Sequence, residues 1–351
     1  MNKHGLDILS WQEQQPEICA RIGSEKANLK IVTKTKNEVF FLEKWIRHHK
    51  KISDGARLII FDNMSTDDEV FEIYKKYWND ILVFSFTSEV DSIHTTYKFM
   101  DLYAILKKTC NFFTIIDSDE FLYLYDGLKL IDDSRIINIL QNRTNINLFV
   151  PAWLDTIHGS ENTFRFKHKE LSMFNYSKPI INARMVHKFF GYYCEIHHTI
   201  KFPALVYGHA PTCFVLLHMK NLNKEQRIKA NMEKLVAFGA IQDTKDFDTV
   251  LNANAEALPP GHIRGYVYEI HRLFGTHDFP VSPHIDEQSV ENGLVEIGDD
   301  KSLRFFPPAL KIEFTKLVSM KTDYFDLIGF DPKHVTLDSR ISIKAYLESF
   351  R

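Results

Sequence analysis

Short apolar runs alternate with amphipathic segments along the first 150 residues of the chain. The apolar runs have the length and composition of strands that are buried on both faces. They lie at residues 29–33, 57–61, 81–86, 112–116 and 147–150. Between them, apolar residues recur at helical spacing, at residues 41–51, 70–77, 93–104 and 134–140. Strands that alternate with helices predict an α/β fold with a mostly parallel sheet.

The pattern becomes less regular after residue 150. Residues 205–207 and 213–217 predict short strands, and residues 223–239 predict an amphipathic helix that ends at a glycine. A last short helix is predicted at residues 341–350. We therefore expect a mainly helical C-terminal extension after the sheet. The predicted divisions of the chain are an N-terminal tail or helix at 1–28, an α/β domain at 29–220 and a C-terminal region at 221–351.

The composition excludes several classes of protein. Hydrophobic residues make up 44% and charged residues 25% of the 351 residues, which is an ordinary globular balance. A net charge of -3 does not fit a nucleic-acid binder. The four cysteines are scattered, which excludes a disulfide scaffold and a structural zinc site. No signal peptide or run of about 20 apolar residues is visible, so we expect a cytoplasmic protein that at most touches the inner membrane face peripherally.

Polar residues follow three of the predicted strands at the point where each strand ends. They are Lys-Asn-Glu at residues 36–38, Asp62 with Asn63, and Asp117 with Asp119. The carboxyl ends of parallel strands meet at one edge of a sheet, where ligands of α/β proteins bind. Each group also has a structural alternative, as an acid at a helix N-terminus or as a turn. Three such groups at successive strand ends favour a binding site.

The candidate chemistry of this edge is metal binding. No glycine-rich phosphate loop and no nucleophile elbow follows any predicted strand. A bound phosphate would therefore need another partner. Two carboxylates separated by one residue, as in Asp117 and Asp119, suit a hard divalent cation that holds a diphosphate.

Residues 31–122 resemble GT-A glycosyltransferases related to families 2 and 92. Lys-Asn-Glu at 36–38 precedes a helix with Phe-Leu and Trp-Ile-Arg-His-His, as in that group. Asp-Asn-Met-Ser-Thr-Asp at 62–67 and Asp-Ser-Asp-Glu-Phe-Leu at 117–122 match two further motifs of the group. The resemblance is patchy beyond residue 122, although His218 lies in an element similar to the group's His-Tyr-x-x-Lys. His94 is a departure, since the group usually has Gln there.

The resemblance implies a GT-A fold, which is Rossmann-like, and a hexosyltransferase that uses a nucleotide-diphosphate sugar with Mn2+ or Mg2+. The donor is expected to be UDP-linked, and the acceptor to be a glycan or a lipid-linked saccharide in polysaccharide biosynthesis. Asp119 would bind the metal directly and His218 would complete its shell. Asp117 would contact the ribose, or the metal through water.

The resemblance also implies roles for residues around the nucleotide. Asp62 would read the base, Glu38 and the backbone near Thr33 would flank the base and ribose, and Lys98 would offset diphosphate charge. An inverting enzyme also needs a general base for the acceptor hydroxyl. Our first candidate is Glu195, which lies beside two histidines, and the second is Asp155.

Two other functions remain open from the sequence. One is a non-catalytic relative that binds a nucleotide sugar or a glycan. The other is a metal-dependent hydrolase whose centre would use histidines as ligands. Its candidate ligands are Asp117, Asp119, His197, His198 and His218. The donor sugar, the stereochemistry and the oligomeric state also stay open.

Overall fold

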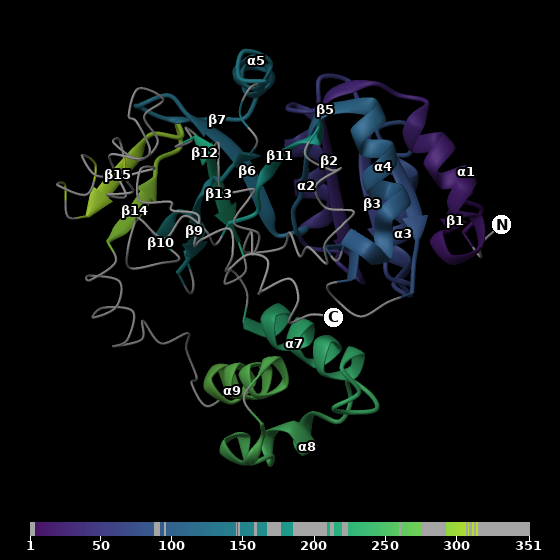
Figure 1. Ribbon diagram of the computed structural model, residues 1–351. Helices are drawn as coiled ribbons and strands as arrows, with labels where there is room; N and C mark the ends of the chain where they lie inside the picture. Colours follow the sequence, from purple (N-terminus) through teal and green to yellow (C-terminus); the bar gives the residue numbers. More distant parts are fainter. Residues whose placement is uncertain are drawn as a thin grey trace, which may run out of the picture.

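The computed structural model describes most of the first 166 residues and several later segments. The described residues are 4–87, 92–94, 96–144, 146, 148–157, 160–166, 177–184, 209–210, 214–219, 224–259, 261–274, 293–306, 308, 311 and 314. Within them the chain forms two sheets that lie side by side, with a cluster of helices beneath them (Figure 1).

The first sheet is mostly parallel. Its strands, in spatial order, are β1 (Leu9–Ser10), β4 (Ile81–Ser85), β3 (Leu58–Asp62), β2 (Ala27–Thr35), β5 (Cys110–Ile115), β11 (Ile180–Asn182), β8 (Leu148–Phe149) and β12 (His209–Ala210). The first five run parallel, and β11 pairs antiparallel with β5. Chain order therefore reverses between β2 and β5, because β3 and β4 lie on one side of β2 and β5 on the other.

Both faces of this sheet are covered by helices. On one face pack α2 (Leu42–Lys50) and α3 (Asp68–Lys76), and on the other pack α1 (Trp11–Gly23) and α4 (Met100–Thr109). Alternate residues of β3 illustrate the result, since Ile60 joins the first core whereas Ile59 and Phe61 join the second. Because both faces of the sheet are buried, its strands are continuous apolar runs in the sequence.

The second sheet begins where the chain leaves β5. Residues 116–119 form a short connection, and β6 (Glu120–Tyr125) then enters the new sheet. In spatial order its strands are β15 (Leu303–Phe306), β14 (Leu294–Ile297), β10 (Thr163–Phe166), β9 (Ala152–Thr156), β13 (Phe214–His218), β6 and β7 (Leu130–Ile131). α5 (Arg135–Gln141) follows β7 and packs Ile136, Ile137 and Leu140 into the first core.

A third group of helices has a small core of its own. It comprises α7 (Lys224–Ala237), α8 (Phe247–Leu251) and α9 (His262–Phe274). Met232 and Leu235 of α7 pack against Val267 and Ile270 of α9. Figure 1 shows α7 as the member of this group that lies nearest the sheets.

The predicted fold class is confirmed as α/β, with a mostly parallel sheet flanked by helices and helices after residue 221. The predicted helix at 93–104 begins only at Met100 and follows two 3-10 segments, Ser92–His94 and Thr96–Phe99. β14 and β15 add strands to the C-terminal region. The expected elements at 205–207 and 341–350 lie outside the described residues, and the domain boundaries remain a prediction.

The sequence predicted β13 of the second sheet, at residues 213–217, but not the other strands of that sheet or helix α9. Strands such as β6 and β9 lack a clean two-residue alternation, because most of their residues are buried on both faces. No helix in the described part of the chain is long and apolar enough to span a membrane.

Asn37 joins two loops at the carboxyl edge of the first sheet. Its side-chain oxygen accepts hydrogen bonds from the backbone N–H groups of Thr66, at 2.7 Å, and Asp67, at 3.1 Å. Its own N–H donates to the hydroxyl of Ser65 at 2.8 Å. The residue has φ of 50°, a left-handed conformation that asparagine tolerates better than most residues. Asn37 therefore fixes the loop after β2 against the loop after β3.

We expect Asn37→Ala to lower the free energy of unfolding by about 1–3 kcal/mol, because two backbone donors lose their acceptor and alanine is strained at this φ. Urea denaturation measures the change. Asn37→Gly serves as the matched control, since it also loses the acceptor but tolerates the backbone conformation, and it should be less destabilising than Asn37→Ala. An unchanged stability of Asn37→Ala would contradict this role.

Candidate active site

The candidate site lies where strand order reverses in the first sheet, at the carboxyl ends of β2 and β5. Open α/β sheets bind ligands at such a switch point. The connection from β5 to β6 carries Asp117 and Asp119 there, and Lys34 near the end of β2 lies 3.7 Å from Asp117. The predicted convergence of the three polar strand ends is confirmed by the pairing of Thr35 with Asp62 and of Val32 with Ile115.

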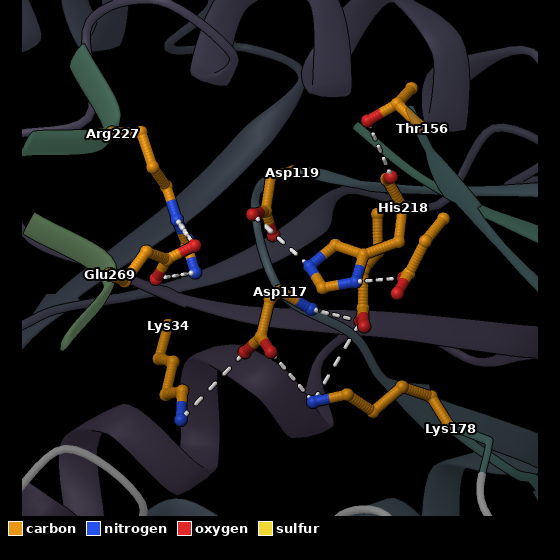
Figure 2. Close-up of polar contacts among 10 residues, drawn as sticks. Lys34, Asp117, Asp119, Thr156, Lys178, His218, Arg227 and Glu269 are labelled. Atoms are coloured by element: carbon orange, nitrogen blue, oxygen red, sulfur yellow. Dashed lines mark hydrogen bonds and ion pairs between the residues drawn. The ribbon is translucent and has the colours of Figure 1, made fainter. Parts of the chain in front are cut away.

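Asp117 is held by two lysines (Figure 2). Its Oδ2 lies 2.7 Å from Nζ of Lys178, and its Oδ1 lies 3.7 Å from Nζ of Lys34. The Asp117 side chain keeps 25% of its surface exposed, whereas Lys178 has none. A substrate can therefore reach the carboxylate but not the lysine that holds it.

Lys178 also faces a second buried acid. Its Nζ lies 3.8 Å from Oε2 of Glu120, and the same oxygen accepts the backbone N–H of Asp117 at 2.8 Å. Burial raises the pKa of Glu120 to about 7, and the nearby ammonium of Lys178 opposes that rise. Sequence reasoning missed the role of Lys178, which comes to the site only because β11 pairs with β5.

Asp119, His218 and Asp155 form a continuous chain of contacts. Nε2 of His218 lies 3.3 Å from Oδ2 of Asp119, and Nδ1 lies 2.9 Å from Oδ1 of Asp155. Burial disfavours the imidazolium, but the two carboxylates outweigh it and raise the pKa of His218 above its usual value. Burial likewise disfavours ionised Asp119, yet His218 holds the pKa of that carboxyl below its usual range.

This geometry fits a divalent cation between Asp119 and His218. Two ligands that each lie about 2.1 Å from one ion at roughly a right angle are about 3 Å apart, close to the 3.3 Å seen here. A ligating histidine usually donates its other ring N–H to a carboxylate, as Nδ1 can to Asp155. The described residues contain no cluster of three or more candidate ligands, so such an ion would need substrate or water to complete its shell.

Glu38 lies beside the same acids. Its Oε1 accepts the backbone N–H groups of Phe40 and Phe41, both at 3.0 Å, at the start of α2. Burial raises the pKa of Glu38 to about 7, and the charges of Asp119 and Glu233 add to the rise even though the two N–H groups oppose it. The predicted position of Glu38 beside the base and ribose of the donor stays a prediction.

Helix α7 brings two cations that the sequence did not single out, and α9 brings the acid Glu269. Nε and Nη2 of Arg227 bind the carboxylate of Glu269 at 3.1 and 2.9 Å, and Figure 2 shows this pair beside Asp119. Burial and the charge of Arg227 lower the pKa of Lys234, whereas Asp119 acts in the opposite direction. Both cations therefore lie within electrostatic reach of Asp119, and this proximity depends on where α7 lies in the fold.

The structure places two further predicted residues without testing their roles. Asp155 is 1% exposed and its Oδ1 lies 2.9 Å from Nδ1 of His218, so its carboxylate is directed at the imidazole, and its role as a general base stays a prediction. Asp62 is 3% exposed, and its oxygens accept bonds from Ser65 N–H and the Tyr74 hydroxyl, both at 2.6 Å, an arrangement that favours a role in shaping the turn. Its role as base reader stays a prediction.

Two further residues are placed by the structure, and others are not described. Thr33 is buried in β2, and Lys98 is exposed in the 3-10 segment before α4. Their predicted contacts with the donor remain untested. Glu195, the first candidate for the base, lies outside the described residues, as do His197 and His198.

Comparisons of the sequence with protein-family models and with curated proteins find no match. Among solved structures, the chain is similar to S. aureus TarS 1–349 in complex with UDP-GlcNAc, at 12% identity over 76% of this chain and 79% of that one, with a TM-score of 0.37. It is also similar to GalNAc-T7 with UDP, GalNAc and Mn2+, at 15% identity over 74% and 59%, with a TM-score of 0.34.

A third similar structure is the mannosyltransferase PcManGT from Pyrobaculum calidifontis in complex with GDP-Man and Mn2+, at 10% identity over 88% of this chain and 85% of that one, with a TM-score of 0.34. All three hold a nucleotide sugar, or a nucleoside diphosphate with a sugar. Similarity at TM-scores this low carries no conclusion about function.

Glu38→Gln tests the electrostatics of the site. Because the pKa of Glu38 is raised from 4.5 to about 7 on folding, its contribution to stability is fully present below about pH 4.5 and is lost as the pH rises through about 7. Glutamine keeps the acceptor for Phe40 and Phe41 without the charge. We expect the variant to exceed the wild type in free energy of unfolding at pH 8, by up to about 3 kcal/mol, with a much smaller difference at pH 5.

Denaturant titrations of metal-free protein at both pH values provide the measurement. Glu13→Gln, which changes an exposed acid on α1, is the control and should show the same small difference at both pH values. If Glu38→Gln also gave a pH-independent difference, Glu38 would not be a desolvated carboxyl.

Proposed function

We propose that this chain is a metal-dependent glycosyltransferase of GT-A type, which moves a sugar from a nucleotide-diphosphate donor to a glycan or lipid-linked acceptor. The observation that carries the proposal is the pair formed by Asp119 and His218, 3.3 Å apart at the switch point of a parallel sheet. A protein that supplies one carboxylate and one imidazole leaves most of a cation's shell to substrate phosphates, as is common for Mg2+ and Mn2+. The resemblance of residues 31–122 to GT-A enzymes supports the same conclusion.

The charges around the pair suit a diphosphate. Arg227 and Lys234 reach the site from α7, and Lys34 reaches it from β2. Guanidinium groups bind phosphate oxygens through paired N–H donors, and a rigid arginine loses little freedom on binding. Glu269 supplies that rigidity by binding Nε and Nη2 of Arg227. We therefore assign diphosphate recognition to Arg227 and Lys234 in place of the predicted Lys98.

Asp117 suits a hydroxyl donor such as the ribose of the nucleotide. Its carboxylate is partly exposed, while Lys178 and Lys34 hold it in place. Carboxylates at this edge of α/β sheets accept hydrogen bonds from ribose hydroxyls. A UDP-linked donor remains our expectation from the sequence resemblance.

The chemistry divides between the ion and the chain. When bound, the ion would stabilise the negative charge that develops on the leaving diphosphate. Asp119 and His218 would hold it, and Arg227 and Lys234 would orient the diphosphate and neutralise it further. We propose a base other than the buried Asp155 for the acceptor proton, and Glu195 stays our candidate. A cytoplasmic setting with peripheral membrane contact also stays an expectation.

Asp119→Asn tests the ligand pair directly. We expect wild-type protein to bind UDP only with Mn2+ or Mg2+. Thermal-shift or calorimetric titrations measure this binding, since a ligand that binds the native state raises its apparent stability. We expect Asp119→Asn to lose the metal-dependent part of UDP binding, by at least about tenfold.

Asp133→Asn is the matched control, since it changes an exposed acid paired with Arg135 far from the pair. Its affinity for UDP with Mn2+ should equal that of the wild type. UDP binding that is equally strong without any divalent ion, or unaffected by Asp119→Asn, would contradict a metal-dependent transferase. Donor hydrolysis that no saccharide acceptor increases would indicate the hydrolase instead.

Arg227→Met tests diphosphate recognition. It keeps much of the aliphatic volume but removes the charge, so UDP should bind about 10–100-fold more weakly while uridine binding stays unchanged. Arg264→Met on α9 removes an arginine that pairs with Glu256 and serves as the control. Equal losses of UDP and uridine binding would show that Arg227 acts on the fold and not on the phosphates.

A further inference from the structure

Asp155 and His218 occupy matched positions on neighbouring parallel strands. β9 and β13 pair in parallel, with Asp155 directly opposite His218 in the register. Side chains at matched positions of two paired strands leave the sheet on the same face. The pairing therefore sets Oδ1 of Asp155 at 2.9 Å from Nδ1 of His218 without any help from a flexible loop.

Further contacts fix the surroundings of the imidazole. The Thr156 hydroxyl donates to the carbonyl of His218 at 3.3 Å, and the backbone N–H of Met219 donates to the carbonyl of Asp119 at 2.8 Å. The indole of Trp153 lies 5.3 Å from the imidazole, between ring centroids. The strand that carries His218 is thus tied to the strand of Asp155 on one side and to the Asp119 turn on the other.

The contact to Asp155 decides which nitrogen of His218 carries a proton. An ionised carboxylate only accepts hydrogen bonds, so Nδ1 has to be the donor. In the neutral ring Nε2 then has its lone pair directed at Asp119, which is the form that can bind a metal ion. Asp155 is 1% exposed, so its carboxylate is buried against the imidazole.

We propose that Asp155 is a positioning residue, which holds His218 in the tautomer and orientation that present Nε2 to a divalent ion shared with Asp119. The inference rests on the proposed metal-dependent function and deepens it, by giving the buried acid a role in metal affinity instead of proton transfer. Outer carboxylates of this kind typically contribute 10–100-fold to metal affinity.

Asp155→Asn tests the proposal with little change in volume. A neutral amide accepts from Nδ1–H more weakly, and its NH2 group can instead donate to Nδ1 and favour the wrong tautomer. We expect Mn2+, titrated in the presence of UDP and followed by electron paramagnetic resonance of the free ion, to bind about 10–100-fold more weakly. Asp133→Asn is the matched control, because it makes the same substitution at an acid that pairs with Arg135 and not with His218. It should bind Mn2+ within about twofold of the wild type.

A measurement on the wild type keeps the proposal testable if Asp155→Asn does not fold. Nitrogen NMR of the histidine side chains, with the His218 signals identified from a His218→Gln spectrum, reports the tautomer. Nδ1 of His218 should stay protonated when Mg2+ and UDP bind, while Nε2 loses its proton. A deprotonated Nδ1 would overturn the proposal.

The outcomes separate this inference from the function on which it rests. If wild-type protein binds no divalent ion with UDP, the proposed function fails and the role of Asp155 fails with it. If the wild type binds the ion and Asp155→Asn binds it equally well, the glycosyltransferase proposal stands and only the positioning role is overturned. Weaker ion binding in Asp155→Asn, with Asp133→Asn unchanged, supports both.

Discussion

Lys178 places an ammonium group with no solvent exposure against two carboxylates, Asp117 at 2.7 Å and Glu120 at 3.8 Å. Taking charges out of water is expensive, and the cost is recovered only when opposite charges lie close by with good geometry. The short connection between the two sheets carries Asp117, Asp119 and Glu120 within four residues. Without cations from other segments, the chain could not stay folded with these three carboxylates ionised.

The cations come from segments that are far apart in the sequence. Lys34 lies on β2, Lys178 lies two residues before the start of β11, and His218 ends β13 of the second sheet. Each element therefore has to be in place before the acids are neutralised. The seam between the two sheets, at residues 116–120, is therefore the electrostatic centre of the fold, which supports the cation site proposed for Asp119 and His218.

Asp119 and Glu120 lie in different electrostatic environments, so the two acids can have different roles. Asp119 shares His218 with Asp155 and keeps a lowered pKa, so it stays an anion. Glu120 is buried beside other acids and has a raised pKa of about 7. Pairs of titratable groups with divergent pKa values are typical of functional sites, because one group must hold charge while the other supports the structure around it.

The sequence by itself determined the parallel sheet and the edge that bears the site. Continuous apolar runs and helical spacing predicted β2, β3, β4 and β5, because two-sided burial leaves a clear local signal. The polar residues after these strands, such as Asp117 and Asp119, could be placed at one edge because parallel strands end together. His218 stood out only through a family resemblance that is patchy in that part of the chain.

Only the tertiary structure decided which residues act on those acids. Lys178 reaches Asp117 through the pairing of β11 with β5, and Asp155 reaches His218 through the register of β9 and β13. Arg227 reaches the site because of where α7 lies in the fold. No local sequence pattern predicts these contacts, since the sequence around a lysine or an aspartate does not show whether it lies on the surface or in a buried ion pair. Long-range pairing and burial set their roles, and these properties exist only once the chain has folded.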